Sequence, residues 1–189
     1  MSKKLSEMSL EELWELFPVI LTEHQSNWNK WYSEEKKMLQ GILPEENVAR
    51  MSHIGSTVID NIWAKPIIDI LVEVTIDTHL QNIKEILTFN GYTCMSQSDN
   101  TASFNKGYTE NGFAERVFHL HLRYVGDNNE LYFRDYMMEH PEVAKEYERL
   151  KLDLWNQYKH DRDGYTNAKS EFVTRYTKEA KKVYGDKYY

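Results

Sequence analysis

The sequence predicts an α+β fold, in which a mixed β-sheet is flanked by helices and followed by a C-terminal helical tail. Apolar residues recur at helical spacing in residues 1–47 and again in residues 126–189, whereas most of residues 48–125 alternates in the manner of β-strands. Such segregation of helices from strands is typical of α+β domains. The chain has 189 residues, which suits one domain made of these three parts and allows a sizeable hydrophobic core.

Two helices are expected before the sheet. The first spans residues 9–17, because Ser9 and Glu12 form a capping-box pattern at its start. The second spans residues 25–40, in which apolar and aromatic side chains recur at steps of three and four residues. A proline follows each helix in the sequence, where the helical pattern stops.

The middle of the chain is predicted to contain five strands and one crossover helix. Residues 66–75 have the strongest strand pattern, because branched apolar side chains occupy every second position of one face. A helix over residues 78–90 ends where Gly91 can take the left-handed conformation of a helix C-terminus. The other strands are expected at residues 48–54, 92–97, 102–108 and 115–125.

The last third of the chain is predicted to be helical. One helix covers residues 129–140, and Pro141 suits the first position of the next helix. A loop is expected at residues 160–164, followed by one final helix from residue 165 to residue 183. No second catalytic domain is expected, because the sheet and the helical tail account for nearly the whole chain.

The composition limits the classes of partner. The chain has 23 basic and 30 acidic residues, a net charge of −7. We expect no extended nucleic acid as a partner, because proteins that bind it usually carry a basic stripe. A small phosphorylated ligand is compatible with this charge, since a confined basic pocket can exist on an acidic surface. The sequence does not define the oligomeric state.

The compartment is predicted from what the sequence lacks. No apolar run approaches the ~18 residues of a membrane span, and the first residues show no secretory signal. The single cysteine, Cys94, excludes an intramolecular disulfide and a multi-cysteine zinc site. We therefore expect a cytoplasmic protein with no membrane partner.

A candidate phosphate cradle follows the first strand. The sequence there reads His53-Ile54-Gly55-Ser56-Thr57. Glycine lets a ligand approach the backbone closely, and free N–H groups beside a hydroxyl can hold a phosphate. The alternative is an ordinary turn, which is the more frequent role of a Gly-Ser pair.

An acidic residue lies within the strongest strand. Asp69 shares a strand face with Ile67, Leu71 and Glu73. A carboxylate among apolar residues is costly unless a cation, a hydrogen-bond donor or a metal compensates its charge. Asp69 is therefore either a functional carboxylate or a structural one that bonds to nearby backbone or to an arginine.

The strand at residues 115–125 carries two histidines on one face. His119, His121 and Arg123 alternate with apolar residues, so their side chains point the same way. Two such histidines can share a transition metal, with Asp69 or Glu73 as a further ligand, or can bind an anion together with the arginine. The alternative is a solvated face of the sheet.

These motifs resemble the GrpB family, which is assigned to the nucleotidyltransferase superfamily. The resemblance is strongest from His53 to Val72 and extends over roughly residues 19–176. Further matching segments are Trp28 with Glu34-Glu35-Lys36, Phe118-His119-Leu120-His121-Leu122, Phe133-Arg134-Asp135-Tyr136, His140-Pro141-Glu142, Tyr147, Leu150-Lys151, Tyr165, Ala168 and Lys169.

The resemblance implies a nucleotidyltransferase-like fold and a partial match to that superfamily's site. In the superfamily, a Gly-Ser pair precedes two carboxylates spaced by one residue, and a third carboxylate comes from a later strand. Gly55-Ser56 and Asp69 fit the first parts, whereas Leu71 occupies the second carboxylate position. His119 and His121 stand in place of the third.

The resemblance and the motifs together define the candidate residues. We expect Asp69 and His121 to be catalytic, and Asp69, His119 and His121 to hold Mg²⁺ or another divalent metal. The expected ligand-binding residues are Gly55, Ser56, Thr57, Lys65, His119, Arg123, Arg134, Lys151, Tyr165 and Lys169. For Arg134 the alternative is a local ion pair with Asp135, and for the two helical lysines it is solvation.

Two functions follow from these residues. The first is a metal-dependent nucleotidyltransferase that binds a nucleotide or another phosphorylated small molecule. The second is a catalytically degenerate protein that binds a ligand or a metal as an accessory module. The leucine at position 71 motivates the second hypothesis, and whether the chain is an enzyme is left open.

Overall fold

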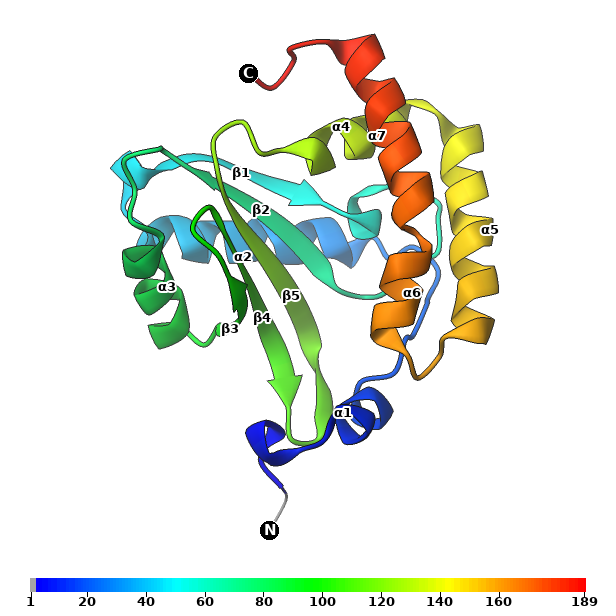
Figure 1. Cartoon of the computed structure of the whole chain (residues 1–189), viewed down its shortest axis with the longest axis horizontal. Helices are drawn as coiled ribbons and strands as arrows, with labels where there is room; N and C mark the ends of the chain where they lie inside the picture. Colours follow the sequence, from blue (N-terminus) through cyan, green and yellow to red (C-terminus); the bar gives the residue numbers. More distant parts are fainter. Residues whose placement is uncertain (1–2) are drawn as a thin grey trace.

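The computed structural model describes residues 3–189, which contain one five-stranded sheet in the order β1-β2-β5-β4-β3 (Figure 1). The strands are β1 Val48–Ile54, β2 Ile68–Val74, β3 Thr93–Gln97, β4 Thr101–Thr109 and β5 Gly112–Tyr124. Strands β2 and β5 are parallel, and the other neighbours are antiparallel. The sheet is therefore mixed, as the sequence predicts.

Seven α-helices surround the sheet within the same residues. They are α1 Leu10–Leu16, α2 Asn27–Ile42, α3 Leu80–Phe89, α4 Asn129–Glu139, α5 Pro141–Gln157, α6 Arg162–Ala168 and α7 Ser170–Tyr184. Figure 1 shows α2 running behind the sheet, whereas α4, α5, α6 and α7 are neighbours at its other side. The α+β fold class is confirmed. None of these helices combines the length and the apolar character that a membrane span needs.

One face of the sheet forms the main hydrophobic core. In β2, Ile68, Ile70 and Val72 are fully buried against helices α2 and α3. Each such side chain contributes about 1.5–3 kcal/mol when it leaves water, so this face fixes the register of the central strands. The alternation in the sequence correctly predicts which face of β2 is buried.

The opposite face is mostly polar, but its apolar positions are also covered. Leu71 is fully buried and packs with Ile54 of β1 and Leu131 of α4. Glu73, one pleat further along, is fully buried and accepts hydrogen bonds from Arg50 and Asn128. Neither side chain is directed at open space, so Asp69 is the one position of this β2 face left for a ligand.

The prediction of one final helix is wrong. The structure has two helices there, and α6 starts at Arg162, inside the predicted loop. The cause is local, because Asp161 caps α6 by accepting a hydrogen bond of 2.7 Å from the Gly164 N–H. The chain then turns at Lys169, which ends α6 and precedes α7. This turn places Tyr165 and Lys169 beside the polar face of the sheet.

Candidate functional site

The turn after β1 brings the backbone against Asp69. Gly55 has φ +74° and ψ −166°, a combination that is essentially restricted to glycine. A Cβ at this position would overlap the Asp69 carboxylate and lie 3.1 Å from the Asp69 Cβ. A short 3₁₀ turn, Ser56–Val58, follows Gly55 in the chain. The predicted cradle and the predicted carboxylate are thus in contact.

Two histidines of β5 contact the Asp69 carboxylate. Asp69 pairs with His119 across the parallel strands, and Oδ1 lies 3.4 Å from His119 Nδ1 and 3.5 Å from His121 Nε2. Burial alone would raise the pKa of Asp69, but hydrogen bonds and charge from the two imidazoles outweigh it and hold that pKa below its usual value. Asp69 is therefore ionised at neutral pH.

Tyr108 and Arg162 extend this network, and neither is among the residues predicted from the sequence. The Tyr108 hydroxyl lies 2.8 Å from His119 Nε2, and Arg162 donates a hydrogen bond of 2.7 Å to the same hydroxyl. Burial lowers the pKa of His119, and the Asp69 carboxylate opposes this change. Tyr108 and Arg162 therefore hold the orientation of the imidazole that faces Asp69.

A cluster of cations lies beside this network. Lys65 Nζ and Lys169 Nζ lie 5.1 and 4.4 Å from the centre of the Tyr165 ring. Lys151 is almost fully buried, donates to the Trp63 carbonyl oxygen and lies 4.8 Å from the centre of the Tyr147 ring. We call Lys65, Lys151, Lys169 and Arg162 the cation cluster. Within residues 3–189, no carboxylate lies within 4 Å of any of its charged groups.

The lysines of the cation cluster have unusual pKa values. Burial, followed by the charges of Lys169 and Arg162, lowers the pKa of Lys65 to about 7. The pKa of Lys151 falls to about 7, first through burial and then through Lys169. Burial lowers the pKa of Lys169 to about 8, while Asp69 acts in the opposite direction. These values indicate positive charges that lack sufficient compensation.

We expect these lysines to make the stability of the ligand-free protein depend on pH. Their folded-state pKa values lie below the unfolded value of 10.5, so the unfolded chain binds more protons between pH 7 and 10. The free energy of unfolding in urea should therefore rise from pH 7 to pH 9. Lys151→Met should reduce this slope, whereas Lys178→Met, on an exposed part of α7, should leave it unchanged. Equal slopes for all three proteins would contradict the assignment.

A cavity of about 330 Å³ opens in front of Asp69. His121 and Ser56 line it together with Tyr147 of α5 and Phe133 of α4. Burial raises the pKa of Tyr147 to about 12, against the effect of a hydrogen bond with Ser56. The cavity therefore combines the ionised Asp69, an imidazole and several hydroxyls with an aromatic wall, and Glu130 of α4 also lines it.

The structure brings most of the predicted ligand-binding residues together, but not all of them. Thr57 is buried, and its hydroxyl lies 2.9 Å from His53 Nε2. Arg134 bonds to Asp135, which is the local pairing named as its alternative. Arg123 lies 3.5 Å from Asp127 and 3.8 Å from Glu130. The side chains of Thr57, Arg134 and Arg123 therefore already have partners, and neither arginine belongs to the cation cluster.

The residues at Asp69 do not fit the carboxylate set that holds Mg²⁺ in the superfamily. Leu71 is buried under Leu131, and His121 pairs with it across the strands in place of an acid. In the described part of the chain, no three side chains of His, Cys, Asp or Glu are grouped to hold a metal ion. The metal role of Asp69, His119 and His121 therefore stays a prediction.

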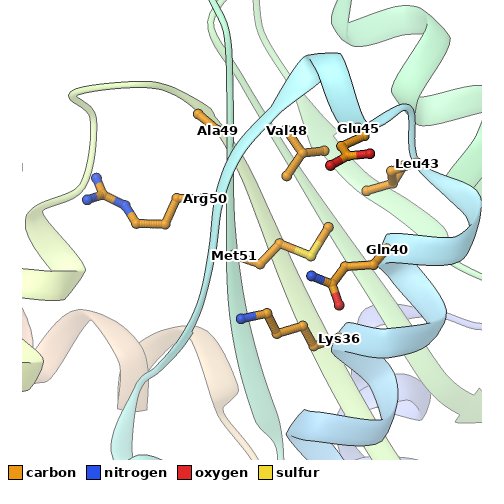
Figure 2. A pocket seen from close by; sticks show the side chains of 8 residues that line it. All are labelled: Lys36, Gln40, Leu43, Glu45, Val48, Ala49, Arg50 and Met51. Atoms are coloured by element: carbon orange, nitrogen blue, oxygen red, sulfur yellow. The ribbon is translucent and has the colours of Figure 1, made fainter.

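A second hollow, of about 570 Å³, lies at the edge strand β1, away from Asp69. Figure 2 shows Lys36 and Gln40 of α2 beside Met51, while Arg50 points to the opposite side of β1. Arg50 is the ion-pair partner of the buried Glu73, so its charge is compensated. One lysine without an ion-pair partner among residues 3–189, Lys36, lines this hollow together with one carboxylate, Glu45, whereas several such cations lie near Asp69.

The mixed sheet and its flanking helices form a nucleotidyltransferase-like fold. The structure of the Cid1 poly(U) polymerase bound to MgATP has a TM-score of 0.51 and 10% sequence identity, over 84% of this chain and 52% of that chain. At this identity the similarity concerns the fold alone. Asp69 lies at the start of β2, opposite Ile54 at the end of β1, and the site is built around this position.

The chain belongs to the GrpB family. The family described as GrpB protein matches residues 18–179. The glutamate-rich protein GrpB of Alkalihalophilus pseudofirmus is 39% identical over 82% of this chain and 91% of that protein, and the UPF0157 protein YqkA of Bacillus subtilis is 33% identical over 84% and 46%. The crystal structure of conserved protein GrpB from Enterococcus faecalis has a TM-score of 0.74 and 32% identity, over 87% of this chain and 99% of that chain.

Proposed function

We propose that this protein binds a nucleotide or another phosphorylated small molecule, with its phosphate at the cation cluster and its remainder in the cavity at Asp69. The observation that carries the proposal is the cluster itself. Four cationic side chains meet beside one carboxylate, and none of them has an ion-pair partner within the described residues, although the whole chain is acidic.

Electrostatics supports an anionic ligand at this place. Burial disfavours the charged forms of Lys65 and Lys169, and Lys65 is also repelled by Lys169 and Arg162, so the pKa values of both lysines are lowered. Lysine and arginine donate charge-assisted hydrogen bonds to phosphate oxygens, which are about twice as strong as neutral ones. A phosphate would therefore relieve the repulsion that the ligand-free protein retains.

The Tyr165 hydroxyl is a further argument for a missing partner. The residue is fully buried, and its hydroxyl has no hydrogen-bond partner among the described residues. A buried hydroxyl without a partner costs about 1–3 kcal/mol. Because Lys65 and Lys169 flank the same ring, a phosphate oxygen held by them is a suitable acceptor for this hydroxyl.

The second candidate function adds catalysis to binding. Asp69 is ionised and lines the cavity with His121, so it can accept a proton from a hydroxyl group that attacks a phosphate. Leu71, in place of a second carboxylate, favours the alternative of binding without transfer. Mass spectrometry of protein and small molecules after incubation with nucleoside triphosphates separates the two, since only the enzyme yields a nucleotidylated product.

Isothermal titration calorimetry with the full chain tests the binding proposal. The probes are ADP, inorganic pyrophosphate and adenosine, each with and without Mg²⁺. We expect ADP and pyrophosphate to bind in at least one condition and adenosine to bind much more weakly, because the phosphates supply most of the affinity. Absence of binding by both phosphorylated probes in every condition would refute the proposal.

Tyr165→Phe should separate stability from binding. Without ligand, the variant should be as stable as the wild type or about 1 kcal/mol more stable, because an unpartnered buried hydroxyl is removed. Its affinity for ADP should fall about tenfold, the effect of losing one hydrogen bond to a charged group. Urea unfolding and calorimetry measure the two quantities. Tyr184→Phe, which removes a surface hydrogen bond to Glu139, should bind ADP normally. Unchanged affinity in Tyr165→Phe would exclude the hydroxyl as a ligand donor.

A further inference from the structure

The site at Asp69 lacks the second β2 carboxylate of the nucleotidyltransferase pattern, because Leu71 occupies that position. Phosphoryl and nucleotidyl transfer sites place carboxylates around divalent ions, which neutralise phosphate oxygens. In this chain the neighbouring position on β2 is the buried Leu71, and the facing strand offers His119 and His121. Asp69 already contacts two imidazoles, and although Glu130 also lines the cavity, no three His, Cys, Asp or Glu side chains among residues 3–189 are grouped to hold a metal ion.

The cation cluster supplies positive charge at the same place from the chain itself. Lys65 lies just before β2, Lys151 belongs to α5, and Arg162 and Lys169 stand at the two ends of α6. Lys65 and Lys169 lie on the same Tyr165 ring, and Arg162 reaches the Asp69 network through the Tyr108 hydroxyl and His119. Elements far apart in the sequence thus bring four basic side chains to the region of Asp69.

We infer that this site binds a diphosphate group directly through the cation cluster, without a divalent metal ion, so that lysine and arginine side chains take the place of the metal. The inference rests on the proposed function and narrows its ligand class to diphosphate-bearing compounds, such as a nucleoside diphosphate or pyrophosphate. A phosphomonoester carries about −1.5 to −2 charges at neutral pH on a single phosphate group. A diphosphate carries more charge and spans more donors.

Mg²⁺ should then weaken the binding of the ligand, whereas at a metal-dependent site it promotes binding. Mg²⁺ in solution binds the diphosphate and reduces its negative charge, which weakens its attraction to lysine and arginine. The ion also has no carboxylate pair on β2 to receive it. Mg²⁺ should therefore compete with the protein for the ligand.

Calorimetry on the full chain with ADP and AMP tests the inference. In EDTA, ADP should bind at least tenfold more tightly than AMP, and excess Mg²⁺ should weaken ADP binding several-fold. Lys169→Gln should weaken ADP binding in EDTA at least tenfold, whereas Lys178→Gln, on the exposed side of α7, should not change it. Asp69→Asn should bind ADP in EDTA as tightly as the wild type or more tightly, because a negative charge near the phosphates is removed.

The outcomes separate this inference from the proposed function. If ADP binds only when Mg²⁺ is present, or if Asp69→Asn abolishes its binding, the metal-free site is refuted while the binding function stands. Equal affinity for ADP and AMP would refute the diphosphate class alone. If no phosphorylated probe binds with or without Mg²⁺, both proposals fail. The comparison of wild-type protein in EDTA and in Mg²⁺ needs no variant, so it is informative even if a substitution impairs folding.

Discussion

Replacing Lys65 and Lys169 together by glutamine is expected to lower the affinity for ADP or pyrophosphate by a factor of about 100 or more. Hydrogen bonds to charged groups contribute about 1.5–3 kcal/mol each, and every 1.4 kcal/mol is a factor of about ten in affinity. Both ammonium groups lie against the same Tyr165 ring and lack ion-pair partners in the described structure, so a bound phosphate can contact both. Calorimetry at pH 7 measures the loss directly.

The double variant should fold normally. Neutral glutamines remove the cost of burying two charged groups, which lowers the pKa of both lysines, so the ligand-free protein should be at least as stable as the wild type in urea. The matched control is Lys37→Gln with Lys178→Gln, which makes the same change in net charge at two exposed positions. Equal losses of affinity in the two double variants would show that general charge, rather than the cation cluster, attracts the ligand.

Gly55→Ala is expected to destabilise the protein by about 3 kcal/mol or more and to disturb the site. The alanine would have to adopt a backbone conformation that costs about 1–3 kcal/mol outside glycine. Its Cβ would also overlap the carboxylate of Asp69, which contacts His119 and His121. Asp69 must move or the turn must open, and either change adds to the backbone cost. Urea unfolding measures the stability.

Gly41→Ala is the matched control for this substitution. Gly41 lies in helix α2 and is exposed, and a Cβ added there would meet no heavy atom within 4 Å outside the helix's own backbone. Alanine is favoured over glycine in a helix by about 0.8–1 kcal/mol, so this variant should be more stable than the wild type. A Gly55→Ala protein of wild-type stability would contradict the close approach of the turn to Asp69.

The sequence predicts the fold well because its signals are local. The alternation in residues 66–75 reports a strand with one apolar face, and that face is the one buried against α2 and α3. Capping chemistry is also local, and Ser9 accepts the predicted hydrogen bond from the Glu12 N–H at 3.2 Å. The early start of α6 depends on the Asp161 cap, and the break at Lys169 escapes the sequence pattern because the apolar stripe continues across it without a change of period.

The site is predicted less completely because it depends on contacts between distant segments. Asp69 and His119 are on facing strands, which the motif comparison implies, but the pairing of β4 with β5 that brings Tyr108 to His119 has no local signal. Arg162 lies in a segment predicted to be a loop, so nothing in the sequence connects it to Tyr108.

The same limit applies to the charged residues for which the sequence predicts a ligand role. Arg134 and Lys169 look equally available in the sequence. The structure pairs Arg134 with Asp135 and with the Tyr188 hydroxyl, whereas Lys169 meets no carboxylate in the described residues. Only the three-dimensional arrangement distinguishes a compensated cation from an unpaired one, and this difference is what selects the cation cluster.

A crystal structure of the full chain with bound ADP is the most direct test of the proposed binding site. We predict that the diphosphate lies within hydrogen-bond distance of Lys65 Nζ and Lys169 Nζ, with the rest of the ligand in the cavity lined by Ser56 and Asp69. A diphosphate bound elsewhere, such as the hollow at Lys36 beside β1, would contradict the assignment of the site.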